Sequence, residues 1–142
     1  MTFYRKLATG NLNQVAKGLS GTLPDLLGGT VVVDEQLATD LGNSPMTVAD
    51  VALMVRDLSA FLVGALRPDS LWLHTTNVSI ADNNFVKVGP GQYTMLTLRF
   101  ESLFSREIRL ERVAYAAQKM GGALTAHGDS GFSNVRIFLP RS

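Results

Sequence analysis

The sequence contains no cysteine, only one tryptophan and only two histidines among its 142 residues. The absence of cysteine excludes disulfides and thiolate chemistry and gives no sign of secretion. Charged residues make up 18% and the formal net charge is +1, so no broad electrostatic field favours binding to nucleic acid or membrane. The most apolar window, residues 48–66, is interrupted by Arg56 and Asp57, which argues against membrane insertion. The N-terminus lacks the apolar core of a signal peptide, so we expect a cytoplasmic protein.

The residues that are present predict one globular domain over 1–142, because hydrophobic residues make up 46% of a chain long enough to bury a core. Residues 1–10 are short, mixed and basic, and we interpret them as a remnant of an upstream helix or linker.

The stretch from Leu103 to Pro140 organises the chain. Apolar residues recur with the period of an amphipathic helix from Leu103 onward, and Gly121-Gly122 marks the helix end because glycine adopts the left-handed conformation cheaply. Residues 123–127 alternate like a strand, residues 127–131 are rich in turn formers, and Phe132 to Leu139 predicts a second strand.

The N-terminal half predicts two helices around a strand. Asn11 can cap a helix with an apolar stripe over residues 12–26, which Pro24 would weaken, kink or divide. The β-branched run of residues 30–35 predicts a strand. Thr47 and Asp50 resemble a capping box for a helix to about Leu66 that is apolar nearly all round and therefore predicted to be mostly buried.

Two further strands follow, at residues 71–80 and 92–100, joined by a turn-rich connection that includes Gly89-Pro90-Gly91. Predicted strands follow one another directly in the sequence, and predicted helices are few. This order predicts an α+β fold, a two-layer sandwich with helices on one face of a mixed sheet.

The order of elements resembles the ATP-binding domain of sensor histidine kinases, a branch of the Bergerat-fold ATPases. The C-terminal pattern carries the resemblance most clearly: Gly121-Gly-Ala-Leu-Thr-Ala126, then Gly128-Asp-Ser-Gly131, then Val135 to Pro140. The stretches 3–6, 12–13, 23–33, 65–78 and 88–98 also match in order, so the resemblance covers nearly the whole chain. It implies the histidine-kinase ATPase fold.

The nucleotide motifs that the resemblance leads us to expect are replaced. The family's magnesium-binding asparagine would lie near Phe61–Gly64, and no Asn, Asp or Glu occurs in residues 61–66. The adenine-binding aspartate would lie near Phe100, where no glycines follow, which leaves Glu101 as a weak candidate for nucleotide binding. In place of a glycine-rich phosphate loop, residues 105–110 are charged and branched, and such residues prevent backbone N–H groups from cradling an anion. We therefore predict no cofactor, no metal and no catalytic residue.

Other polar candidates have ordinary interpretations. Arg106 and Arg109 lie near a predicted helix N-terminus and could bind phosphate, but a solvated face with neighbouring glutamates explains them better. His74 and His127 lie at strand positions, unlike a phosphoacceptor histidine, and they have no carboxylate or cysteine at metal-ligand spacing.

Ser130 lies between Asp129 and Gly131 without the strand-to-helix elbow of a nucleophile, so it is interpreted as a turn residue. Trp72 and Phe61 could line a pocket, although core packing is the ordinary interpretation.

These observations favour a catalytically inactive histidine-kinase-like domain that acts as a regulatory or protein-interaction module in two-component signalling. Its partner would be a response-regulator receiver domain, a kinase or a second copy in a homodimer. Three alternatives remain open: a divergent ATP-binding kinase domain that uses Glu101 and a remodelled pocket, a fragment of a histidine phosphotransferase with a degenerate ATP-binding domain, and an unrelated α+β structural protein.

Overall fold

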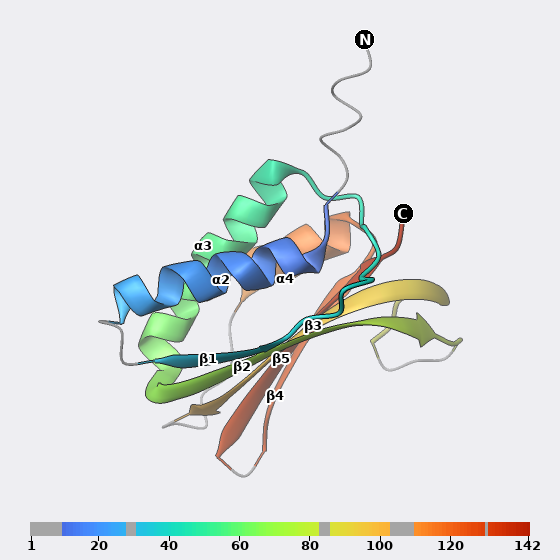
Figure 1. Cartoon of the computed structure of the whole chain (residues 1–142). Coiled ribbons are helices and arrows are strands. Elements are labelled where there is room, and N and C mark those ends of the chain that lie inside the picture. Colours follow the sequence, from blue (N-terminus) through green and yellow to red (C-terminus); the bar gives the residue numbers. More distant parts are fainter. Residues whose placement is uncertain (1–9, 28–30, 83–85, 103–109, 130) are drawn as a thin grey trace.

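The computed structural model describes residues 10–27, 31–82, 86–102, 110–129 and 131–142. These residues form an α+β two-layer sandwich, in which the helices lie on one face of a single mixed sheet, as predicted (Figure 1). In chain order the elements are α2 (Leu12–Leu26), β1 (Val32–Gln36), α3 (Val48–Ala65), β2 (Leu66–Ile80), β3 (Gly91–Ser102), α4 (Glu111–Lys119), β4 (Ala123–Asp129) and β5 (Phe132–Pro140).

The sheet has five strands in the order β1-β2-β3-β5-β4. The edge strand β1 pairs with β2 in parallel, whereas the other neighbours are antiparallel. The two predicted hairpins are confirmed as β2–β3 and β4–β5, although β2 begins at Leu66, earlier than expected, with a register irregularity before Leu71. The single parallel pair is what makes the sheet mixed.

Helix α2 begins at the predicted cap. The Asn11 side chain accepts a hydrogen bond from the Asn13 backbone at 3.0 Å, and the Gln14 side chain accepts one from the Asn11 backbone, also at 3.0 Å. Pro24 lies inside one continuous helix, so the alternative of two shorter helices is wrong. Because Pro24 lies in the last turn, the helix loses few hydrogen bonds. Buried side chains such as Leu19 hold the helix on the sheet.

The capping box of α3 is confirmed, because the Thr47 backbone N–H donates to the Asp50 carboxylate at 2.8 Å and the Asp50 backbone N–H donates to the Thr47 hydroxyl at 3.1 Å. The prediction that this helix is mostly buried is wrong for its outer side. Val48 is 73% exposed and Val63 is 44% exposed. The sheet and α2 cover only part of the helix, so its apolar residues extend onto the surface.

Helix α4 begins later than predicted. The helix starts at Glu111, because Leu110 has φ −126° and ψ 55°, outside the helical range. The predicted helical residues 103–109 lie outside the described part of the chain. The predicted stop is confirmed: Gly121 has φ +87°. At Gly122 a Cβ would lie 1.8 Å from the Phe138 carbonyl oxygen, so only glycine lets the chain pass this close to β5.

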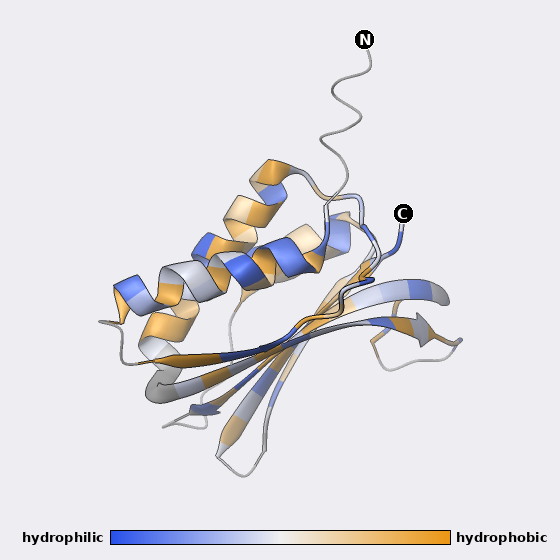
Figure 2. Ribbon diagram, viewed as in Figure 1, coloured by the Kyte–Doolittle hydropathy of each residue, from blue (hydrophilic) through white to orange (hydrophobic). Residues whose placement is uncertain are grey.

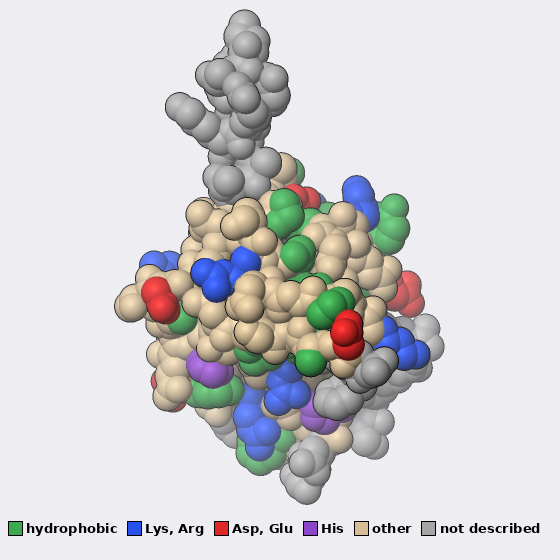
Figure 3. All heavy atoms as spheres, turned by 90° about the vertical axis from the view of Figure 1, so that its right-hand side faces the viewer, with side chains coloured by type: hydrophobic (Ala, Val, Ile, Leu, Met, Phe, Trp, Pro, Cys, Tyr) green, Lys and Arg blue, Asp and Glu red, His purple; other side chains and the backbone are tan. Residues whose placement is uncertain are grey.

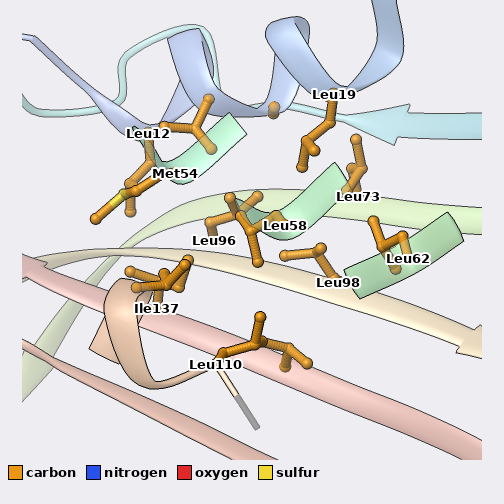
Figure 4. Packing of buried hydrophobic residues seen from close by; sticks show 14 of the residues in the cluster. Leu12, Leu19, Met54, Leu58, Leu62, Leu73, Leu96, Leu98, Leu110 and Ile137 are labelled. Atoms are coloured by element: carbon orange, nitrogen blue, oxygen red, sulfur yellow. The ribbon is translucent and has the colours of Figure 1, made fainter. Parts of the chain in front are cut away.

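The core lies between the helices and the sheet. Leu12 and Leu19 of α2 and Leu58 of α3 point towards Leu96 and Leu98 of β3, and all five side chains are fully buried (Figure 4). Hydrophobic and hydrophilic bands alternate along the helices and strands (Figure 2), as expected where one side of each element faces this core.

One part-buried polar cluster joins α2, β2 and the loop after β1. The Thr75 hydroxyl donates to Asn13 Oδ1 at 2.6 Å and accepts from the Ala38 backbone N–H at 2.9 Å, and Asn13 Nδ2 donates to the Ala38 carbonyl at 2.8 Å. Each group in the cluster is satisfied, so it fixes how α2 lies on the sheet. In the described part of the chain, no helix is long and apolar enough to cross a membrane.

Candidate functional site

A pocket of about 570 Å³ lies between α3 and the start of α4, and we call it the α3–α4 pocket. Helix α3 places Asp57, Ala60 and Phe61 on one wall, and residues 110–113 form the other. The wall opposite α3 is therefore the N-cap and first turn of α4, which begins at Glu111. Its size is within the range of small-molecule sites.

Two aromatic rings meet beside this pocket. Phe61 from α3 and Phe100 from β3 pack edge to face, with ring centroids 6.0 Å apart and an interplanar angle of 70°. Phe100 is 2% exposed, whereas Phe61 is half-buried and lines the pocket. Phe61 therefore gives the α3 wall of the pocket an apolar surface without hydrogen-bonding groups, and Phe100 packs against Phe61 in the core.

The charged groups of the pocket are mixed in sign. Asp57 Oδ1 lies 3.3 Å from Arg56 Nε, and Asp57 Oδ2 is buried without a hydrogen-bond partner among the described residues. Glu111 and Arg112 come from the start of α4, where Leu110 provides no side-chain cap. Among the described lining residues, two carboxylates and one guanidinium would disfavour a polyanion such as a nucleotide phosphate tail.

No family model matches the sequence, and no curated protein matches it. Solved structures are similar. The Acinetobacter baumannii histidine kinase AdeS matches with a TM-score of 0.67 and 9% identity, over 94% of this chain and 66% of that chain. The mycobacterial sensor histidine kinase MprB matches with a TM-score of 0.63 and 11% identity, over 94% of this chain and 97% of that chain. The chain has the fold of a histidine kinase ATP-binding domain.

The ATP-binding-domain fold is also shared with the blue-light activated histidine kinase of Erythrobacter litoralis EL346, with a TM-score of 0.55 and 17% identity, over 90% of this chain. This chain spans 41% of that kinase and just under two thirds of AdeS. At such low identities the likeness establishes the fold of the domain.

Within this fold, the residues predicted to replace the nucleotide motifs lie together. Phe61, near the expected place of the magnesium-binding asparagine, contacts Phe100, near the expected place of the adenine-binding aspartate. Glu101 does not lie with these two residues. Successive side chains of a strand point to opposite faces of the sheet. Because Phe100 faces the core, Glu101 lies on the face away from the helices. The α3–α4 pocket is on the helical side.

The histidines and the tryptophan also lie on the sheet face away from the helices. Trp72 was interpreted as a core residue, which is wrong: it is half-buried and its ring lies 5.1 Å from that of His74, while the core is formed by its neighbours Leu71 and Leu73. His127 is exposed on β4. Phe61 does pack against the core. Arg106, Arg109 and Ser130 lie outside the described residues, so their interpretations stay predictions.

A second, apolar groove of about 800 Å³ runs between α2 and α3, beside the exposed side chains of Leu26 and Val63. A smaller one of about 340 Å³ lies between α3 and α4 near Tyr115. Among the described residues, no three His, Asp or Glu side chains gather as metal ligands.

The sequence analysis missed one cluster, formed by Arg99, Asn134 and Phe132. Arg99 donates a hydrogen bond to Asn134 and lies over the ring of Phe132. The alternation along β3 places Arg99 on the same face as Trp72, but only the pairing of β3 with β5 brings Arg99 to Asn134.

Proposed function

We propose that this chain is a catalytically silent relative of the histidine kinase ATP-binding domain and acts through protein contacts in two-component signalling. The observation that carries the proposal is the contact between Phe61 and Phe100. The resemblance assigns these places to a magnesium-binding asparagine and an adenine-binding aspartate. Two phenyl rings offer neither a metal ligand nor a hydrogen-bond partner for a base.

The polar lining of the α3–α4 pocket supports the same proposal. A nucleotide needs cations, a metal or free backbone N–H groups near its phosphates. Asp57 and Glu111 oppose such charge, and Arg112 is the one basic side chain among the described residues that line the pocket. The partner would be a receiver domain, a kinase or a second copy, and the setting would be the cytoplasm.

The experiment that tests this is calorimetric titration of the protein with magnesium-ATP and with ADP, together with thermal melting. A ligand that binds only the folded state stabilises it by about 2.7 kcal/mol at a hundred times its Kd, which raises the melting temperature. We expect neither heat nor a melting shift at millimolar nucleotide. Saturable binding of either nucleotide would refute the silent assignment.

The runner-up is a divergent ATP-binding domain, which the existence of the α3–α4 pocket favours. In that case Glu101 would take the place of the missing aspartate. Nucleotide binding that disappears in Glu101→Ala would support this role. Binding that persists in Glu101→Ala would remove Glu101 from it, in agreement with the position of this side chain on the far face of the sheet.

A further inference from the structure

The sheet face away from the helices, which we call the open face, carries two rows of side chains across the strands. The register places Trp72, Arg99, Asn134 and His127 in one row, and His74, Thr97, Arg136 and Thr125 in the next. Figure 3 shows Lys and Arg side chains (blue) close to histidines (purple) on the lower half of that view, where the sheet lies. Cations and aromatic groups thus share this face.

Arg99 is exposed but held in one orientation. Its Cζ lies 4.5 Å from the ring centroid of Phe132, and its Nη1 donates to Asn134 Oδ1 at 3.3 Å. A cation over a ring and a hydrogen bond to a buried amide both restrict the guanidinium, and among the described residues only Asn134 accepts a side-chain hydrogen bond from it. A partner would then lose less conformational freedom when it binds this side chain.

Arg136 completes the patch. Arg136 lies on β5 opposite Thr97 and diagonally across from Arg99. At such diagonal positions the two Cα atoms are roughly 7–8 Å apart. Thr97 is 4% exposed and Asn134 is 5% exposed, so small side chains form a floor between the two arginines. We call Arg99, Arg136, Asn134 and Phe132 the arginine patch.

Among the described residues, neither Arg99 nor Arg136 forms an ion pair. Within the described part of the chain the one ion pair is Arg56–Asp57 on α3. Three acidic positions share the open face. Glu101 is two residues further along β3, Asp34 is two strands away from Arg99, and the register places Asp129 opposite Phe132. Glu101 and Asp34 form no ion pair with Arg99. The two guanidinium groups therefore form no ion pair with the described acidic side chains and can bind carboxylates of a partner.

We propose that the arginine patch docks a partner protein through clustered carboxylates. Planar guanidinium groups bind carboxylates through paired, charge-assisted hydrogen bonds, and two of them at this spacing fit two acidic side chains of one segment. A single-stranded nucleic acid fits less well, because it needs free aromatic faces on which bases stack. Here Arg99 covers Phe132, and His74 packs beside Trp72. The inference rests on the proposed function for its expectation of a protein partner.

The test is a nuclear magnetic resonance titration of the full chain with an octaglutamate peptide, repeated with oligothymidylate and with octalysine. We expect the peptide alone to shift amides, and the shifts to gather on the central residues of β3 and β5. The double variant Arg99→Gln with Arg136→Gln should bind about tenfold more weakly or worse, since it removes the charge-assisted hydrogen bonds to the carboxylates. The matched control is Arg112→Gln on α4, which should bind like the unmodified protein.

Opposite outcomes would overturn the proposal. The proposal is wrong if the amide shifts gather on the helices, or if Arg112→Gln weakens peptide binding as much as the double variant does. It is also wrong if oligothymidylate binds this face more tightly than the peptide. The melting temperature of the double variant should stay within a few degrees of the parent because Arg99 is exposed and Arg136 half-buried. Nucleotide binding measured separately would overturn the proposed function but leave the arginine patch intact, so the two failures are distinguishable.

Discussion

The contact between Phe61 and Phe100 can be measured as a coupling energy. Phe100 is 2% exposed, so Phe100→Leu should destabilise the protein by up to about 1.5 kcal/mol, the usual limit for a hydrophobic exchange of similar volume. Phe61→Leu should cost less because Phe61 is half-buried and lines the α3–α4 pocket. Edge-to-face rings at 6.0 Å contribute about 0.5–1.5 kcal/mol beyond their burial.

The double variant should therefore be more stable than the sum of the single losses predicts, by that coupling of about 0.5–1.5 kcal/mol. The assay is urea unfolding of the parent, both single variants and the double variant, followed by circular dichroism. The control pairs Phe100 with Phe138, which lies on the other face of the sheet, and this pair should be additive within about 0.3–0.5 kcal/mol. A Phe61–Phe100 coupling no larger than that of the control would refute the inference that these rings act as a unit.

Three further predictions concern single positions. Gly122→Ala should destabilise the protein by more than about 3 kcal/mol or prevent folding, since the new methyl would overlap the Phe138 carbonyl. Gly21→Ala, in an open helical site, should instead stabilise the protein by about 0.5–1 kcal/mol. Thermal melting measures both effects. Thr75→Val should cost about 1–3 kcal/mol in urea unfolding because it leaves two part-buried hydrogen-bond partners, Asn13 and the Ala38 backbone, without Thr75, whereas Thr75→Ser should recover most of that loss. Arg56→Gln should cost no more than about 1 kcal/mol, because the side chain is 66% exposed and its ion pair is weakened by solvent; a larger loss would contradict a surface role.

Local chemistry explains what the sequence predicted well. The Asn11 cap, the Thr47–Asp50 capping box and the Gly121 turn each depend on residues a few positions apart, and all three are confirmed. The fold class followed from the order of such local elements. It did not require knowledge of which strands pair.

The errors arose where distant parts of the chain decide the outcome. The outer side of α3 stays exposed because the sheet, α2 and α4 cover only part of that helix, which its composition does not reveal. Trp72 was placed in the core on residue type, although alternation with buried Leu71 and Leu73 puts it on the opposite face. The arginine patch depends on the register between β3 and β5, which no single stretch of sequence contains.

The replacement of polar site residues by phenylalanine has a consequence for stability. A ligand-binding domain keeps polar groups in its pocket that are fully paired only when the ligand is bound, and each unpaired buried group costs about 1–3 kcal/mol. A buried ring instead contributes about 1.5–3 kcal/mol without a ligand. Phe100 is in the core cluster and Phe61 packs against it. If the proposal holds, the domain is folded whatever the nucleotide concentration, and its open face is presented to a partner at all times rather than only in a nucleotide-bound state.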